Sequence, residues 1–180
     1  MKLKTLAAAL AICLLCCSAF SMTAFAAENN TSATTSVLYT VQGGYTVNIP
    51  ASVNLNSNET IQISASELAL PSGKNLVVRL SADSFDETGA FYLTSSGSSD
   101  RIPVDVCRAH YEGGQSMFLR ASECLYNPEV AIFDSTSLQQ EGAFVPSEYG
   151  QLSFVLGDVS GVVAGDYTGQ LHFLIGLEDK

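Results

Sequence analysis

Hydrophobic and polar residues alternate with a period of two along most of the chain after residue 36. Successive side chains of a β-strand point to opposite faces, so this period is typical of strands with one buried and one solvated face. The expected inward-facing sets are Tyr45, Val47 and Ile49; Ile61 and Ile63; Leu76, Val78 and Leu80; Ile102, Val104 and Val106; Leu152, Phe154 and Leu156; and Leu171, Phe173 and Ile175. A further strand is expected at residues 91–94.

Turn residues separate these segments, for example at Gly43-Gly44, Gly113-Gly114 and Ala164-Gly165-Asp166. About nine or ten short strands with such turns predict an all-β fold, a two-sheet antiparallel β-sandwich of Ig-like or jelly-roll-like type. A closed β-barrel is the alternative. The only helix candidates are short, at residues 64–70 and 135–140.

Residues 1–26 have the features of a signal peptide. Lys2 and Lys4 precede an apolar run from Leu6 to Phe20, and Ala24-Phe25-Ala26 supplies the small residues that signal peptidase requires. Cleavage after Ala26 or Ala27 leaves a polar leader at 27–36 and a single sandwich domain at 37–180. The protein is therefore expected to be secreted, without a wall or membrane anchor, so that any retention at the cell surface is non-covalent.

The chain is strongly acidic, with 18 Asp and Glu residues against eight Lys and Arg. Removal of Lys2 and Lys4 with the signal peptide lowers the net charge from −10 to −12. Phosphates and anionic lipid headgroups would repel such a protein. Nucleic acid and membrane surfaces are therefore not expected as partners.

Two cysteines, Cys107 and Cys124, lie outside the signal peptide. In an oxidising compartment we expect them to form a disulfide. A regular hairpin centred on Gly113-Gly114 would place Cys107 opposite Arg120, too far from Cys124 for a bond. The prediction therefore requires residues 121–123 to leave the regular ladder.

The alternative role for these cysteines is zinc binding together with His110 and His172. Only Cys107-x-x-His110 has the close ligand spacing that is usual in structural zinc sites. The sequence also lacks a Gly-x-Ser-x-Gly elbow, and nothing selects a catalytic set among its two histidines and 18 acids. We therefore expect no enzyme activity, no metal centre and no cofactor.

Four acidic residues flank the strand predicted at 91–94 and are weak candidates for a calcium site, because loops of this kind can gather oxygen ligands. They are Asp83, Asp86, Glu87 and Asp100. Sugar-binding sandwiches usually need exposed aromatic rings; the chain has no Trp, and Tyr111 and Tyr149 are its best surface candidates because they lie in turn-rich segments.

Two stretches carry a resemblance to known proteins. Residues 45–53, YTVNIPASV, resemble the opening strand of small exported β-sandwich proteins of Gram-positive bacteria. Residues 165–173, GDYTGQLHF, are similar to the closing strand of those proteins and of pilin-like and adhesin-like domains. The resemblance implies an exported sandwich; the chain lacks the sortase signal of covalently assembled pilins.

Two functions follow as hypotheses. The first is a secreted or surface-associated β-sandwich with a structural or adhesive, pilin-like role. In it, an extended N-terminal segment pairs with an open sheet edge of a neighbour, so the partners are other copies or other cell-surface proteins. The alternative is a soluble extracellular binding module for glycan or calcium.

Overall fold

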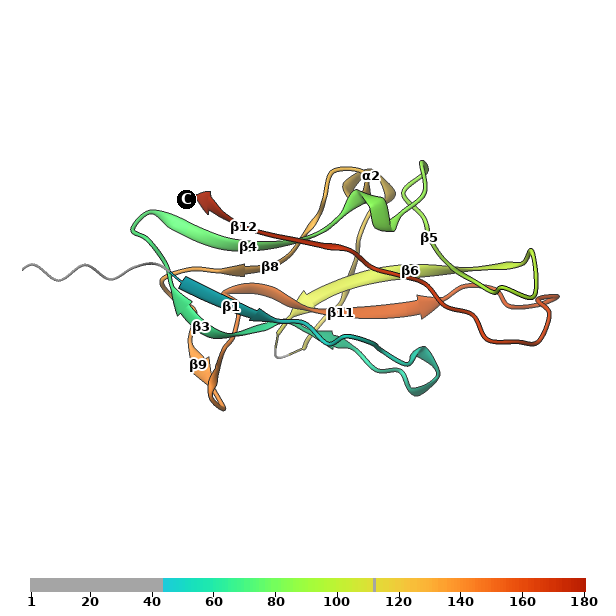
Figure 1. Cartoon of the computed structure of the whole chain (residues 1–180), viewed down its shortest axis with the longest axis horizontal. Coiled ribbons are helices and arrows are strands. Elements are labelled where there is room, and N and C mark those ends of the chain that lie inside the picture. Colours follow the sequence, from blue (N-terminus) through green and yellow to red (C-terminus); the bar gives the residue numbers. More distant parts are fainter. Residues whose placement is uncertain (1–43, 112) are drawn as a thin grey trace, which may run out of the picture. The chain divides into compact units, whose positions relative to one another are not determined.

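The computed structural model describes residues 44–111 and 113–180. The predicted signal peptide (1–26), the leader (27–36) and residues 37–43 of the predicted domain lie outside these ranges. Within them the chain forms two antiparallel sheets, of four and eight strands, that do not close into a barrel (Figure 1). The predicted β-sandwich is confirmed, and the alternative of a closed barrel is wrong.

The smaller sheet has the strand order β1-β3-β10-β9. Its strands are β1 (Gly44–Asn48), β3 (Ser64–Ala69), β10 (Ala143–Phe144) and β9 (Gln139–Gln140). β3 pairs with β1 from Ala69 to Ser64 and with β10 at Ala65. The helix predicted at 64–70 is therefore wrong, because this segment is needed as a strand between two partners.

The larger sheet has the order β12-β4-β8-β11-β6-β5, with β2 added to β11 and β7 added to β6. Its strands are β2 (Ile61–Gln62), β4 (Lys74–Leu80), β5 (Phe91–Thr94), β6 (Arg101–His110), β7 (Met117–Phe118), β8 (Glu129–Phe133), β11 (Glu148–Leu156) and β12 (Phe173–Asp179). The helical segments are short: α2 (Ala121–Cys124) and the 3-10 turns η1 (Leu55–Ser57) and η2 (Ala82–Ser84). The helix predicted at 135–140 is a turn followed by β9.

β11 changes its partner at a corner formed by Tyr149 and Gly150. Glu148 and Tyr149 pair with β8, whereas the strand from Gly150 onward pairs with β6. Both corner residues have a positive φ, 59° at Tyr149 and 102° at Gly150, a conformation that is unusual for a bulky side chain. The corner lies between the part of β11 that pairs with β8 and the part that pairs with β6, and Tyr149 at this corner lines the second candidate site described below.

The core contains most of the inward faces that the period-two pattern predicts, but Leu156, which the pattern also places inward, is 40% exposed. Leu76, Val78 and Leu80 of β4 are fully buried, and Val104 and Val106 of β6 are nearly so. Their partners across the strands and sheets are also buried: Ile61, Ile63, Ala65, Phe91, Val130, Ala131, Phe133 and Leu152.

No helix in the described part of the chain is long and apolar enough to cross a membrane.

Candidate functional site

The first candidate site is an apolar surface between β1 and β12, each of which is an outer strand of its own sheet. Among the described residues, no strand pairs with the free side of either one. Ile175 and Leu177 of β12 lie opposite Val78 and Leu76 of β4, which are fully buried, so all four side chains face the core. Ile175 is nevertheless 42% exposed and Leu177 is 39% exposed.

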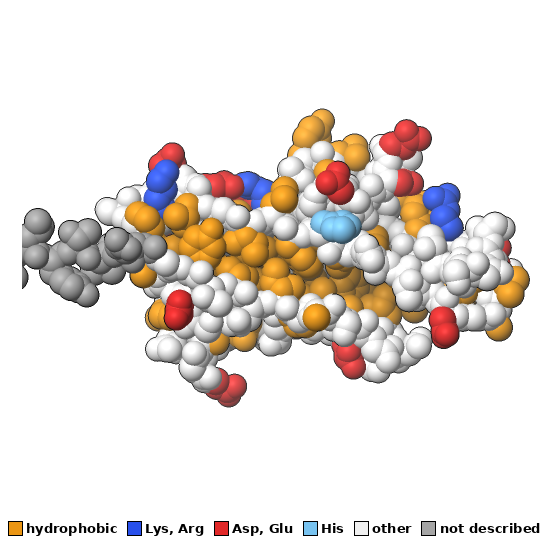
Figure 2. All heavy atoms as spheres, in the orientation of Figure 1, with side chains coloured by type: hydrophobic (Ala, Val, Ile, Leu, Met, Phe, Trp, Pro, Cys, Tyr) orange, Lys and Arg blue, Asp and Glu red, His pale blue; other side chains and the backbone are white. Residues whose placement is uncertain are grey.

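Tyr45 continues this surface on β1. It lies opposite Leu68, which packs against the core, and it is 39% exposed although the pattern predicts a core residue. Figure 2 shows hydrophobic atoms in a band between β1 and β12. We call the surface formed by Tyr45, Val47, Ile175 and Leu177 the open edge, because it combines exposed core-facing side chains with unpaired strand edges.

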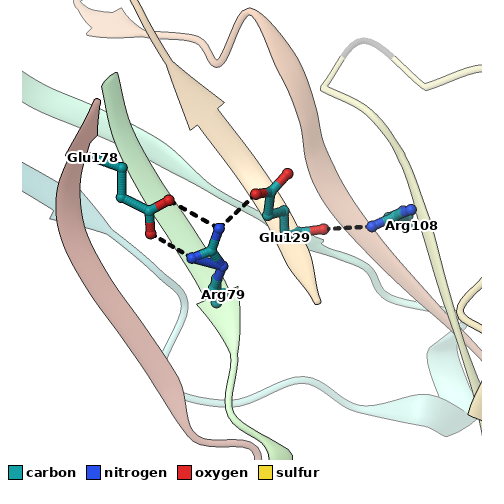
Figure 3. A network of polar contacts seen from close by, with 4 residues as sticks. All are labelled: Arg79, Arg108, Glu129 and Glu178. Carbon is teal, nitrogen blue, oxygen red and sulfur yellow. Dashed lines mark hydrogen bonds and ion pairs between the residues drawn. The ribbon is translucent and has the colours of Figure 1, made fainter. Parts of the chain in front are cut away.

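A second candidate site begins with a polar network on the outer face of the larger sheet. Arg79 lies between Val78 and Leu80, which face inward, so its side chain points outward. Its guanidinium donates to both carboxylate oxygens of Glu178 (Figure 3). Nη1 donates to Oε1, and Nη2 donates to Oε2 at 2.9 Å. Nη2 also donates to Glu129 Oε1 at 2.6 Å. The hydrogen bond to Glu178 is the largest cause that raises the pKa of Arg79.

Arg108 joins the network from β6, the strand that pairs with β11 after the corner. Its Nη1 donates to the backbone oxygen of Glu129 at 2.9 Å (Figure 3). Its Nη2 donates to Glu123 of α2 at 3.3 Å. The guanidinium carbon lies 4.4 Å from the ring centroid of Tyr149, and His110 stacks on the same tyrosine at 6.2 Å. Arg108 therefore connects β6 to β8, α2 and the corner.

An open groove of about 580 Å³ lies between the α2–β8 loop and the corner of β11; of the residues just described, Glu178 and His110 do not line it. Arg79, Arg108 and Glu129 contribute its polar surface, and Tyr126 and Tyr149 contribute its aromatic surface. We call it the arginine groove. The sequence predicts Tyr149 as an exposed aromatic residue for sugar binding. It does not predict Tyr126 or the paired charges for this site, because only the fold brings these residues together with Tyr149. Tyr111, the other candidate, lies at a different, smaller pocket.

The structure contains Cys107 and Cys124 as two free, buried thiols, so the expected disulfide is not found. Residues 121–123 do leave the ladder, as part of α2. The hairpin, however, places Cys107 opposite Phe118 rather than Arg120. The register therefore differs by two residues from that of a regular hairpin centred on Gly113-Gly114, and Cys124 lies beyond β7, in α2.

We expect both thiols to resist alkylation at pH 8 in the folded protein and to react fully in denaturant without a reductant. Burial is the main cause that raises both pKa values, that of Cys124 to about 11, and the thiolate is the reactive form. Because the folded pKa is raised, this contribution to stability is present below the ordinary value near 9 and is lost as the pH rises through 11. Intact-mass analysis checks the prediction; thiols that appear only after reduction would contradict it.

The four acidic calcium candidates do not form a cluster. No group of three or more His, Cys, Asp or Glu side chains that could hold a metal occurs in the part of the chain that the structure describes. Asp86 instead accepts hydrogen bonds from Thr88 and from the backbone of Ala90, and Asp100 accepts one from Val163; these bonds lower both pKa values. The Asp86 carboxylate thus stabilises its own turn, and the Asp100 carboxylate links two segments that are distant in sequence.

Comparison of the chain with protein-family models, with curated proteins and with solved structures finds no match. The resemblance of residues 45–53 and 165–173 to exported surface proteins therefore stays a prediction. Any functional assignment must rest on the open edge and the arginine groove themselves.

Proposed function

We propose that the protein is exported and has a structural or adhesive role at the cell surface, in which its open edge accepts an extended segment of a neighbouring copy. The observation that supports this role most strongly is the exposure of Ile175 and Leu177, whose cross-strand partners are fully buried. An added strand would cover these side chains and would pair with the free backbone groups of β1 or β12.

The segment that precedes β1 has the sequence of a suitable occupant. Val37, Tyr39 and Val41 alternate with Leu38 and Thr40, so an extended backbone would present three apolar side chains on one face. Each copy has one such segment and one open edge, so the contact is head-to-tail and can continue through many copies. The net charge of −12 without the signal peptide opposes association, so salt should favour it.

We expect the chain that begins at Ala27 to form concentration-dependent assemblies, and a chain that begins at Gly44 to be monomeric. The shortened chain should still bind a synthetic peptide of residues 36–43, because its open edge is intact. A chain that begins at Val37 tests whether the polar leader contributes. Size-exclusion chromatography with light scattering and a peptide titration measure these outcomes. Monomers for both longer chains, with no peptide binding, would overturn the proposal.

A pair of lysine substitutions separates the open edge from general hydrophobic association. Ile175→Lys puts a charge in the proposed strand site, and Leu138→Lys puts one at a side chain that is 66% exposed outside it. The first should weaken association at least tenfold, whereas the second should leave it unchanged. Equal effects of both substitutions would mean that the open edge is not the interface.

A further inference from the structure

We propose that the arginine groove binds a neutral sugar ring, with Tyr126 as the stacking surface. Arg79 contributes to this site from the outer face of the larger sheet, and none of the residues that line the site belongs to the open edge. It would therefore act independently of the association proposed above, as the recognition surface of an adhesive protein.

The charges of the groove exclude most other ligands. Arg79 and Arg108 provide two positive charges to the lining, and Glu123 and Glu129 provide two negative charges that are already paired with them. Glu178 lies outside the lining and adds a third negative charge, paired with Arg79. The local balance is slightly negative in a chain that is acidic overall. An anion would meet repulsion, and a cation would have to displace an arginine from its carboxylates.

Paired charges of this kind remain good partners for hydroxyl groups. A guanidinium has five N–H donors, and each ionised carboxylate has about four acceptor positions. The hydrogen bonds of Arg108 to Glu129 and Glu123 use two of its donors, and the bond from Arg79 uses one oxygen of Glu129. A sugar hydroxyl both donates and accepts, so it can bond to either group without disturbing the pairs.

The aromatic side of the groove is exposed but held in place. Tyr126 is 81% exposed, which is unusual for a large aromatic ring. The next residue, Asn127, has a φ of 52°, and its side-chain oxygen accepts a 2.7 Å hydrogen bond from the backbone of Ala82. Pro128 then accepts a 2.9 Å bond from the backbone of Leu80. The loop therefore presents an exposed ring from an ordered backbone, which reduces the entropy that binding would cost.

The opposite wall is equally ordered. Tyr149 is fixed by the corner in β11 and interacts with both the guanidinium of Arg108 and the ring of His110. A groove of about 580 Å³ has the size of a small-molecule site, and it places hydrogen-bonding groups between two aromatic residues. This arrangement suits a flat ring with hydroxyl groups on its rim and C–H groups on its faces.

The test is an NMR titration of the mature protein with methyl glucoside, methyl galactoside, cellobiose and N,N′-diacetylchitobiose, alongside glucuronic acid and glucosamine as charged probes. We expect at least one neutral sugar to bind with a Kd on the order of 1 mM and to shift the amide signals of the groove. The charged probes should bind at least about threefold more weakly. No shift by any neutral sugar up to about 50 mM, or tighter binding of a charged probe, would overturn the proposal.

Three variants locate the contact. Tyr126→Ala should weaken binding at least tenfold, whereas Tyr126→Phe, which keeps the ring, should stay within threefold of the parent. Phe118→Ala removes an aromatic ring that is 60% exposed and does not line the groove, so it should have no effect. Tyr126 is exposed, so its replacement is not expected to affect folding. Unchanged affinity in Tyr126→Ala would overturn the role of the groove.

Discussion

Replacement of Phe133 by alanine is expected to lower the free energy of unfolding by about 3–5 kcal/mol, the range for large-to-small changes in a closed core. Phe133 lies in β8 opposite Leu76 of β4, and both side chains are fully buried. β4 and β8 occupy the interior of the strand order, so little of the surrounding structure is free to collapse into the cavity. Urea denaturation followed by circular dichroism measures the change through the midpoint.

The matched control for this substitution is Leu138→Ala, which removes a side chain of similar hydrophobicity that is 66% exposed. Its effect should stay within about 0.5 kcal/mol. A loss below about 1 kcal/mol in Phe133→Ala would mean that β8 is not packed in the core as described. That result would also weaken the argument for the open edge, which assumes a well-packed interior beside it.

The inward-facing residues of β4 and β6 could be predicted from sequence because burial imposes a strict period of two on them. Ile102, Val104 and Val106 are buried as expected, and β5 has the expected bounds at residues 91–94. β3 escaped prediction for the opposite reason. Its residues, SASELA, are small or helix-favouring, and they form a strand only because β1 and β10 pair with them from both sides.

The candidate sites depend on information that no local pattern contains. Arg79, Glu129 and Glu178 are spread over almost 100 residues of sequence, and only the order β12-β4-β8 makes them neighbours. Tyr45 follows the period of a core residue, yet the described fold supplies no strand on the free side of β1 to cover it. The sequence therefore predicts which side chains could be buried, but whether a neighbour is present to bury them is decided by the topology.

The second large effect is expected at Gly89, whose replacement by alanine should lower the free energy of unfolding by about 3 kcal/mol or more. Gly89 lies in the turn that the Asp86 carboxylate stabilises, and its φ is 80°. A Cβ atom at this position would lie 2.3 Å from the backbone oxygen of Ala121 and 2.9 Å from its Cα. Because backbone atoms cannot rotate away, α2 would have to move.

Gly73→Ala separates the steric part of this effect from the backbone strain. Gly73 has a nearly identical φ of 76°, but a Cβ atom there would meet nothing within 4 Å. Its replacement should therefore cost only the left-handed conformation, about 1–2 kcal/mol, and the difference between the two variants measures the contact with α2. Cys124 lies buried in α2, so a movement of α2 should expose its thiol. This thiol should therefore react faster with iodoacetamide in Gly89→Ala than in Gly73→Ala. Equal stabilities and equal thiol reactivities in the two variants would show that Gly89 does not pack against α2.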